Sequence, residues 1–140
     1  MLPWRGSTWR GFLSAGGRAF GEALELYGGD WKRLKAKFPK AVLVVAGDFN
    51  QDLAPRHCYG SRDQRQALRK ALKDTDLSAT TGGNRDPIAA RSAPCARIDH
   101  ICITGSAGLT ITATFRWPEA SEPDRRLSDH FGVAVGVRRS

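Results

Sequence analysis

The sequence predicts an α/β fold, with one mixed, largely antiparallel sheet covered by helices on one face. The first indication is Val42–Asn50, in which an unbroken apolar run leads through Gly47 into Asp-Phe-Asn. Such a run is typical of a strand buried on both faces. The second is the apolar/polar alternation of Leu109–Trp117 and Phe131–Val137, which predicts half-buried antiparallel strands. The third is helical spacing of apolar residues before and after the first strand.

Length and charge set the broad class of protein. The chain has 140 residues, the size of one ordinary domain, so we expect a single domain over residues 1–140. It carries 22 basic and 14 acidic residues, a net charge of +8. A basic chain attracts polyanions such as nucleic acid, although the same charge also favours solubility. The excess is greatest in Met1–Lys40, where basic residues alternate with aromatic ones.

The cysteines indicate a reducing compartment. Cys58, Cys95 and Cys102 are odd in number and contain no CxxC pair, which argues against a disulfide framework or a structural zinc site. His57 beside Cys58 is not expected to hold a metal, because adjacent residues rarely ligate one ion. No apolar stretch is long enough to span a membrane, and no signal-peptide core begins the chain. We therefore expect a cytoplasmic protein without membrane contact.

The first forty residues predict a loop and two helices. Met1–Gly17 lacks either periodicity and is expected to be a loop, whose Arg and Trp residues either bind phosphate and bases or are buried. Arg18–Tyr27 and Trp31–Phe38 show helical spacing. Gly28-Gly29 is expected to separate them, with Asp30 as the N-cap of the second helix. Their basic faces are either solvated or bind a partner.

The middle of the chain predicts one helix, one short strand and a polar loop. Arg62–Lys73 has a buried apolar stripe, and Ser61 is its expected N-cap. Asp76–Thr81 is a candidate short strand. The polar loop after it contains Arg85 and Arg91, which either reach substrate phosphates or are simply solvated.

Two polar residues follow the first strand. Asp48 and Asn50 point the same way if the extended backbone continues through Phe49. The end of a central strand is where open α/β sheets place their ligands. A simple turn explains the same residues equally well, since Asp and Asn favour turns.

Arg97–Thr104 predicts a second motif strand, with the sequence RIDHICIT. Alternation places Asp99 on an otherwise apolar face and His100 on the opposite one. A buried carboxylate needs a partner, whereas His100 is interpreted as structural. Asp129 and His130 lie at the start of the final predicted strand.

The stretches VAGDFNQDL, RIDHICIT and LSDHFGV occur in this order, each tied to a strand. Together they resemble the endonuclease/exonuclease/phosphatase superfamily, which includes exonuclease III and pancreatic-type deoxyribonucleases. The resemblance covers about Leu2–Val137. It matches only the C-terminal half of the family domain, which runs to roughly 250 residues. It therefore implies half of a four-layer α/β sandwich.

The resemblance also implies roles for particular residues. His130 would act on the attacking water or the phosphate, with Asp99 orienting it. Asp48 and Asn50 would position the nucleophile and the phosphate, and Asp129 would bind Mg²⁺ or Mn²⁺. Carboxylates with a hard divalent ion, and a histidine polarised by a carboxylate, suit phosphodiester hydrolysis.

The family pattern also includes an asparagine on its first strand and a metal-binding glutamate on a following one. The sequence offers no counterpart for either, since Glu22 and Glu25 lie in a predicted helix. We therefore expect weak or no activity, and an apolar sheet face that a second copy or a complementary chain covers.

Three functions follow as hypotheses. The first is a magnesium-dependent phosphoesterase that acts on nucleic acid. The second is an inactive half-domain that serves as an interaction or nucleic-acid-binding module. The third is an unrelated basic nucleic-acid-binding domain with accidental motif matches. The choice between DNA, RNA and small phosphate esters stays open.

Overall fold

The computed structural model describes part of the chain, and the following account concerns that part. The described residues are 2, 8–9, 12–13, 18–54, 59–86, 98–117, 128 and 130–139. In chain order the elements are β1 (Thr8–Trp9), β2 (Phe12–Leu13), α1 (Arg18–Lys37), β3 (Val44–Asp48), α2 (Arg62–Asp74), β4 (Leu77–Ala79), η2 (Gly83–Arg85), β5 (Asp99–Thr104), β6 (Leu109–Trp117) and β7 (Gly132–Arg139).

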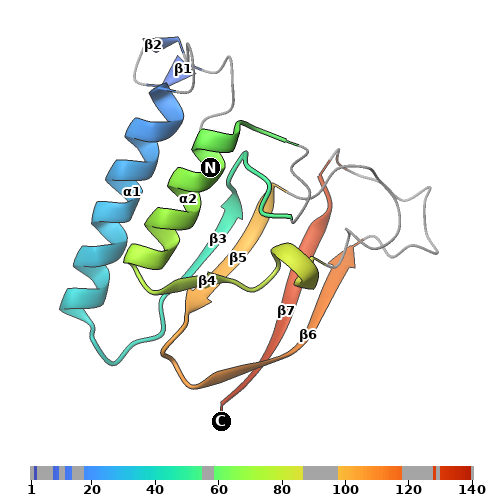
Figure 1. Cartoon of the computed structure of the whole chain (residues 1–140). Helices are drawn as coiled ribbons and strands as arrows, with labels where there is room; N and C mark the ends of the chain where they lie inside the picture. Colours follow the sequence, from blue (N-terminus) through green and yellow to red (C-terminus); the bar gives the residue numbers. More distant parts are fainter. Residues whose placement is uncertain are drawn as a thin grey trace.

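The elements form layers, as the sequence predicts for an α/β fold. Helices α1 and α2 pack on one side of the antiparallel sheet β3-β5-β4, and the β6–β7 hairpin lies on its other side (Figure 1). The prediction of one sheet is corrected, because β6 and β7 pair only with each other among the described strands. In place of the expected N-terminal loop, β1 and β2 pair as a small antiparallel ribbon.

Helix α1 is continuous, and the prediction of two helices is wrong. It runs from Arg18 to Lys37 through Gly28 and Gly29. A glycine costs a helix about 1 kcal/mol relative to alanine. Phe20 and Trp31, on either side of the pair, are both buried, and Gly28 is buried between them. Packing of this apolar stripe against the core offsets the cost, so the helix continues through both glycines.

Helix α2 confirms its predicted position and cap. It spans Arg62–Asp74, and the Ser61 side chain accepts a hydrogen bond from Gln64 N at 3.1 Å. Its buried face consists of Leu68 and Leu72, which meet α1 and the sheet. The buried apolar residues of the core come from both helices, the sheet and their connections: Leu2, Phe20, Ala23, Leu24, Trp31, Phe49, Leu53, Leu68, Leu72, Leu77 and Cys102.

Strand β3 is covered on one face only, which corrects the expectation of burial on both. Val45 packs against the helical core and Phe49 is buried in it. Val44 is 54% exposed, because successive side chains of a strand point to opposite faces. The face of β3 that carries Val44 is therefore an open apolar surface in this structure.

The hairpin contains an irregularity that the sequence does not reveal. The register between β6 and β7 shifts between Ile111 and Ala113, as in a β-bulge. A bulge moves the side chains that follow it to the other face. Phe115 is accordingly 57% exposed, although unbroken alternation would place it on the face of Ile111. Trp117 is exposed with it, at 53%.

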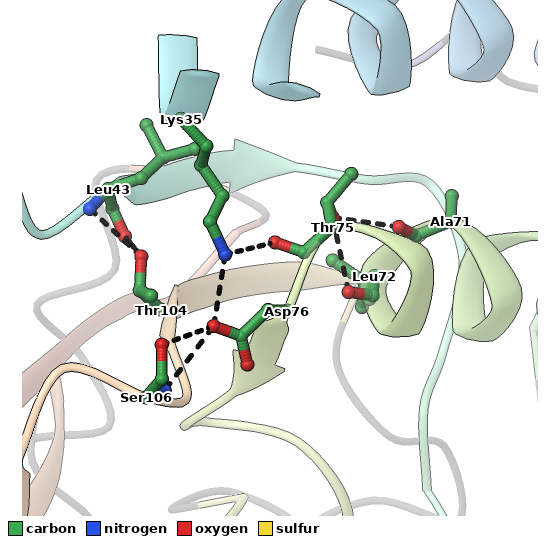
Figure 2. Close-up of polar contacts among 8 residues, drawn as sticks. All are labelled: Lys35, Leu43, Ala71, Leu72, Thr75, Asp76, Thr104 and Ser106. Atoms are coloured by element: carbon green, nitrogen blue, oxygen red, sulfur yellow. Dashed lines mark hydrogen bonds and ion pairs between the residues drawn. The ribbon is translucent and has the colours of Figure 1, made fainter. Parts of the chain in front are cut away.

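A polar cluster ties the end of α2 to α1 and to the turn after β5 (Figure 2). Lys35 Nζ donates to Thr75 O and to Asp76 Oδ2, each at 2.9 Å. Ser106 Oγ donates to the same carboxylate oxygen at 2.6 Å. These hydrogen bonds lower the pKa of Asp76 below its ordinary value, with the larger effect from Ser106 and the next from Lys35.

No helix in the described part of the chain is both long and apolar enough to span a membrane.

Candidate active site

The first half of the site is a closed pair of side chains at the end of β3. Asp48 Oδ1 accepts a hydrogen bond from Asn50 N at 2.7 Å, and Oδ2 accepts one from Asn50 Nδ2 at 2.9 Å. The second Nδ2 hydrogen goes to the carbonyl oxygen of Leu2, at 2.7 Å. Leu2 N in turn donates to Asp48 O at 2.9 Å, so the Leu2 backbone lies along the edge of β3.

This pairing limits what Asn50 can do. Both hydrogens of its amide are donated within the protein, so Asn50 meets a water or substrate only as an acceptor, through Oδ1. The backbone adopts the left-handed conformation here, with φ of +49° at Asn50. Asparagine tolerates this conformation better than most residues do. Asp48 and Asn50 therefore form a turn, as one interpretation of the sequence predicts. The same turn also holds the two side chains where the other interpretation places a ligand site.

The second half of the site joins the two sheets. Asp99 begins β5, and His130 lies just before β7. The distance between His130 Nδ1 and Asp99 Oδ2 is 2.7 Å, so the predicted pairing of these two side chains is confirmed. The Asp99 side chain is 19% exposed and the His130 side chain 39% exposed. The histidine is therefore held by a largely buried carboxylate while its ring reaches the surface.

The two halves meet through the register of the central strands. Asp48 and Asp99 are direct partners in the antiparallel pairing of β3 with β5. Directly opposite residues have Cα atoms about 4.5–5.5 Å apart, with their side chains on the same face. The structure thus brings Asp48, Asn50, Asp99 and His130 to one end of the sheet.

The loop after Asn50 enters the core, and the sequence pattern does not predict the burial of its polar residues. Gln51 and Asp52 are fully buried. Asp52 Oδ2 accepts from Tyr59 N at 2.5 Å, and Gln51 Nε2 donates to Tyr59 O at 2.9 Å. Arg65 Nη1 lies 3.7 Å from Asp52 Oδ1. Burial of polar residues directly after a strand has no periodic signal in the sequence, so this anchoring comes from the tertiary structure.

His100 is the other residue whose partner the sequence does not reveal. It is 1% exposed, and its Nε2 lies 2.9 Å from Gln51 O. Burial lowers the pKa of His100 below its ordinary value, and the hydrogen bond to Gln51 and nearby carboxylates only partly oppose this. The ring packs edge-on against Phe49, with centroids 5.6 Å apart. The structural interpretation of His100 fits this burial.

The three other predicted site residues are Asp129, Arg91 and Arg85. Asp129 and Arg91 lie outside the described residues, as do His57 and Cys58. Arg85 ends the short helix η2 and is exposed. Their suggested roles, metal binding for Asp129 and phosphate contact for Arg85 and Arg91, stay predictions.

Comparison with known proteins gives one result. The model of the Endonuclease/Exonuclease/phosphatase family matches residues 27–130. The match includes β3, β5 and all four converging residues, and it ends at His130. The chain belongs to this family. Comparisons with curated proteins and with solved structures returned no significant match. Family membership places the chain among proteins of hydrolase, nuclease and phosphatase type.

Members of the endonuclease/exonuclease/phosphatase family generally depend on divalent metal ions. Carboxylate oxygens are the ligands that Mg²⁺ and Mn²⁺ prefer. Within the described ranges, however, no three acidic, histidine or cysteine side chains are grouped so as to hold an ion. Both oxygens of Asp48 accept from Asn50, and Asp99 Oδ2 faces His130. The described residues do not complete a metal site.

Proposed function

We propose that this chain is a nuclease-like hydrolase of phosphodiesters or phosphate esters. The observation that carries the proposal is the 2.7 Å contact between His130 Nδ1 and Asp99 Oδ2. A carboxylate that holds one ring nitrogen fixes the orientation of the histidine and stabilises its protonated form. Proton transfer to or from the reacting group would then use Nε2. This is the arrangement needed to deprotonate a water or to protonate a leaving oxygen.

Asp48 and Asn50 would act on the other side of the reacting centre. Because Asn50 offers only Oδ1, it would orient a water by accepting a hydrogen bond rather than by donating one to the phosphate. Asp48 would hold Asn50 in place through both carboxylate oxygens. Water and phosphate would thus be positioned by fixed groups, and such positioning is a major part of catalysis in phosphoryl transfer.

We further propose that the activity requires Mg²⁺ or Mn²⁺, with Asp129 as a ligand. A divalent ion held there would supply positive charge next to the phosphoryl oxygens. The described residues supply few carboxylate oxygens beyond those already hydrogen-bonded, so we expect slow turnover by this chain. Loss of one electrostatic interaction with the transition state costs about a hundredfold or more in rate.

Nucleic acid is the proposed substrate class, for which the net charge of +8 is the support. A nuclease assay with Mg²⁺ or Mn²⁺, run beside His130→Ala, tests the hydrolase proposal. The expected result is slow, metal-dependent cleavage that His130→Ala abolishes. Lys32→Ala, which changes an exposed residue of α1, controls for loss of basic charge. Cleavage that persists in His130→Ala would refute the assigned role.

A binding or assembly module is the second candidate, and the open apolar surface favours it. Val44 on β3 and Phe115 and Trp117 on β6 are each more than half exposed. Contiguous exposed apolar patches mark surfaces that another chain covers, and we propose that the face of β3 carrying Val44 is such a surface. The occupant would be a second copy of this chain or a complementary chain. Sedimentation equilibrium with Val44→Lys distinguishes the cases, because the substitution should dissociate a dimer formed through this face. A wild-type monomer without nuclease activity would leave only a complementary partner.

A further inference from the structure

We propose that His100 is a positioning residue, which fixes the backbone turn at Asn50 from inside the core. The proposal rests on the proposed function, because it concerns the same site. It assigns His100 no contact with substrate. Its effect would pass through Gln51 and Phe49, the two chain neighbours of Asn50.

The Asn50 turn needs support from outside itself. Its φ of +49° lies in the left-handed region, which asparagine tolerates better than most residues but which is still less favourable than the right-handed region. Such conformations persist at functional sites when the surrounding structure holds them. The hydrogen bonds between Asn50 and Asp48 are local, since only one residue separates the two. Asn50 Nδ2 also donates to Leu2 O, and Phe49 N donates to Ile98 O, each at 2.7 Å, so the turn is held from the edge of β3 and from the segment before β5.

His100 supplies the anchor from the core, with one contact on each side of Asn50. On one side its Nε2 bonds Gln51 O at 2.9 Å, and on the other its ring packs against Phe49. His100 is 1% exposed and Phe49 4% exposed, so both contacts lie in the core. Because protein interiors are close-packed, a ring in this place leaves the turn little freedom to move.

The partner atom also fixes the chemical form of the ring. A carbonyl oxygen only accepts hydrogen bonds, so Nε2 carries the hydrogen and donates it to Gln51 O. Among the described residues, Nδ1 has no hydrogen-bond partner and is buried. The neutral ring with hydrogen on Nε2 therefore fits the site, and a second proton on Nδ1 would place an unpaired charge in the core.

Asp99 and His100 thus divide the positioning of the site between two faces of β5. Asp99 holds His130, while His100 holds the Asn50 turn. Consecutive strand residues point to opposite faces, so a substitution of His100 changes contacts on the face away from Asp99. Removing the His100 hydrogen bond should disturb Asn50 and leave the contact between Asp99 and His130 in place. A residue that only filled space would have no such selective effect.

The test compares two substitutions of His100 in the whole chain. His100→Phe keeps an aromatic ring but removes the N–H donor, whereas His100→Gln keeps an amide donor at a similar distance from the backbone. Cys102→Ala is the matched control, since Cys102 is equally buried on the same face of β5 but makes no hydrogen bond with Gln51 in the described part of the chain. Nitrogen-15 NMR follows the Asn50 side-chain amide and the ring nitrogens of His100 and His130.

The expected wild-type spectrum shows a protonated Nε2 and a bare Nδ1 at His100. In His100→Phe the Asn50 amide should shift and exchange faster with solvent, while the His130 ring signals stay unchanged. His100→Gln should restore the Asn50 signals, and Cys102→Ala should lower stability without moving them. The proposal is overturned if His100→Phe leaves Asn50 unchanged, if both substitutions disturb it equally, or if wild-type Nδ1 carries the hydrogen. If His100→Phe does not fold, the tautomer of wild-type His100 and the Asn50 signals of His100→Gln still test the proposal.

Cleavage assays then separate this proposal from the proposed function. If the chain cleaves nucleic acid, His100→Phe should lower kcat by about a hundredfold, the effect of roughly 1 Å of misplacement, and change KM little. His100→Gln should recover most of that loss. If the wild-type chain does not cleave, the hydrolase proposal fails, while the NMR comparison still reports whether His100 positions Asn50.

Discussion

Asp48 and Asp99 face each other at the last paired position of β3 and β5, and each carboxylate is engaged by a different partner. Two like charges directly opposite each other destabilise an antiparallel pair. Asn50 N–H groups compensate one carboxylate, and the His130 ring compensates the other. The candidate site is therefore a place where charge repulsion is offset by the same groups that are proposed to carry the chemistry.

The carboxylate of Asp99 should matter for turnover more than for folding. Asp99→Asn keeps the shape of the side chain but removes the charge that stabilises a protonated His130. We expect kcat for phosphodiester cleavage to fall by about 10²- to 10⁴-fold, the usual contribution of a positioned acid or base. Asp74→Asn, at the exposed end of α2, is the matched control and should cleave normally. Equal activity in both variants would remove Asp99 from the mechanism.

Binding to nucleic acid should depend steeply on salt. The net charge of +8 implies contacts with several phosphates, and each contact releases condensed counterions. Affinity for a short DNA duplex, measured by fluorescence anisotropy, should drop by at least about tenfold between roughly 50 and 200 mM salt. An affinity that does not change over this range would argue for a different ligand.

Acid should destabilise the fold through His100. Its pKa is lowered in the folded protein, mainly by burial, so the unfolded chain binds the proton more readily. The free energy of unfolding should therefore fall as the pH drops below about 6.5, the ordinary value for histidine. Asp86, Asp99 and Asp52 lie close enough to oppose part of this effect.

Urea denaturation across this pH range measures that effect, with His100→Gln as the comparison. The variant lacks the titrating group, so its stability should change less between about pH 6.5 and 5. Asp74 and Asp76 also have lowered pKa values, from an ordinary value of 3.8, so their contribution is lost only at lower pH. Parallel curves for the two proteins would show that His100 is not the group responsible.

Cys102 should behave as an inert thiol. It is fully buried, and burial raises its pKa from 9.0 to about 12. The folded state thus favours the neutral thiol, and its stability contribution is present below pH 9.0 and lost as the pH rises toward 12. Alkylation followed by peptide mass spectrometry should label Cys102 only after denaturation. Rapid labelling in the native protein would contradict this burial.

The sequence predicts strand faces well, because their period of two is independent of distant contacts. Asp99 is placed correctly on one face of β5, and His100 and Cys102 on the other. The rule that a buried carboxylate needs a partner predicts only that Asp99 is paired. That His130 is the partner is what the family resemblance implies, and local geometry alone does not identify it.

The features that the sequence misses depend on tertiary contacts. Gly28 permits a helix break, and only packing of the surrounding stripe against α2 and the sheet decides otherwise. The shift after Ile111 in β6 depends on the partner strand, so alternation alone assigns Phe115 to the wrong face. The carbonyl group of Leu2 cannot be identified as a partner of Asn50 from composition, since a backbone acceptor is present at every residue.

The pairing of β3 with β5 has a consequence for biosynthesis. Val44 pairs with Ile103, and the His130 ring comes from the segment just before the last strand. A nascent chain leaving the ribosome would thus form α1 and α2 well before the Asp99 carboxylate could meet His130 between the two sheets. Long-range strand pairing is slow compared with helix formation. His130 would join the site only after β5 and the segment before β7 had been synthesised, so shorter translation products would contain both helices without the pair of His130 and Asp99.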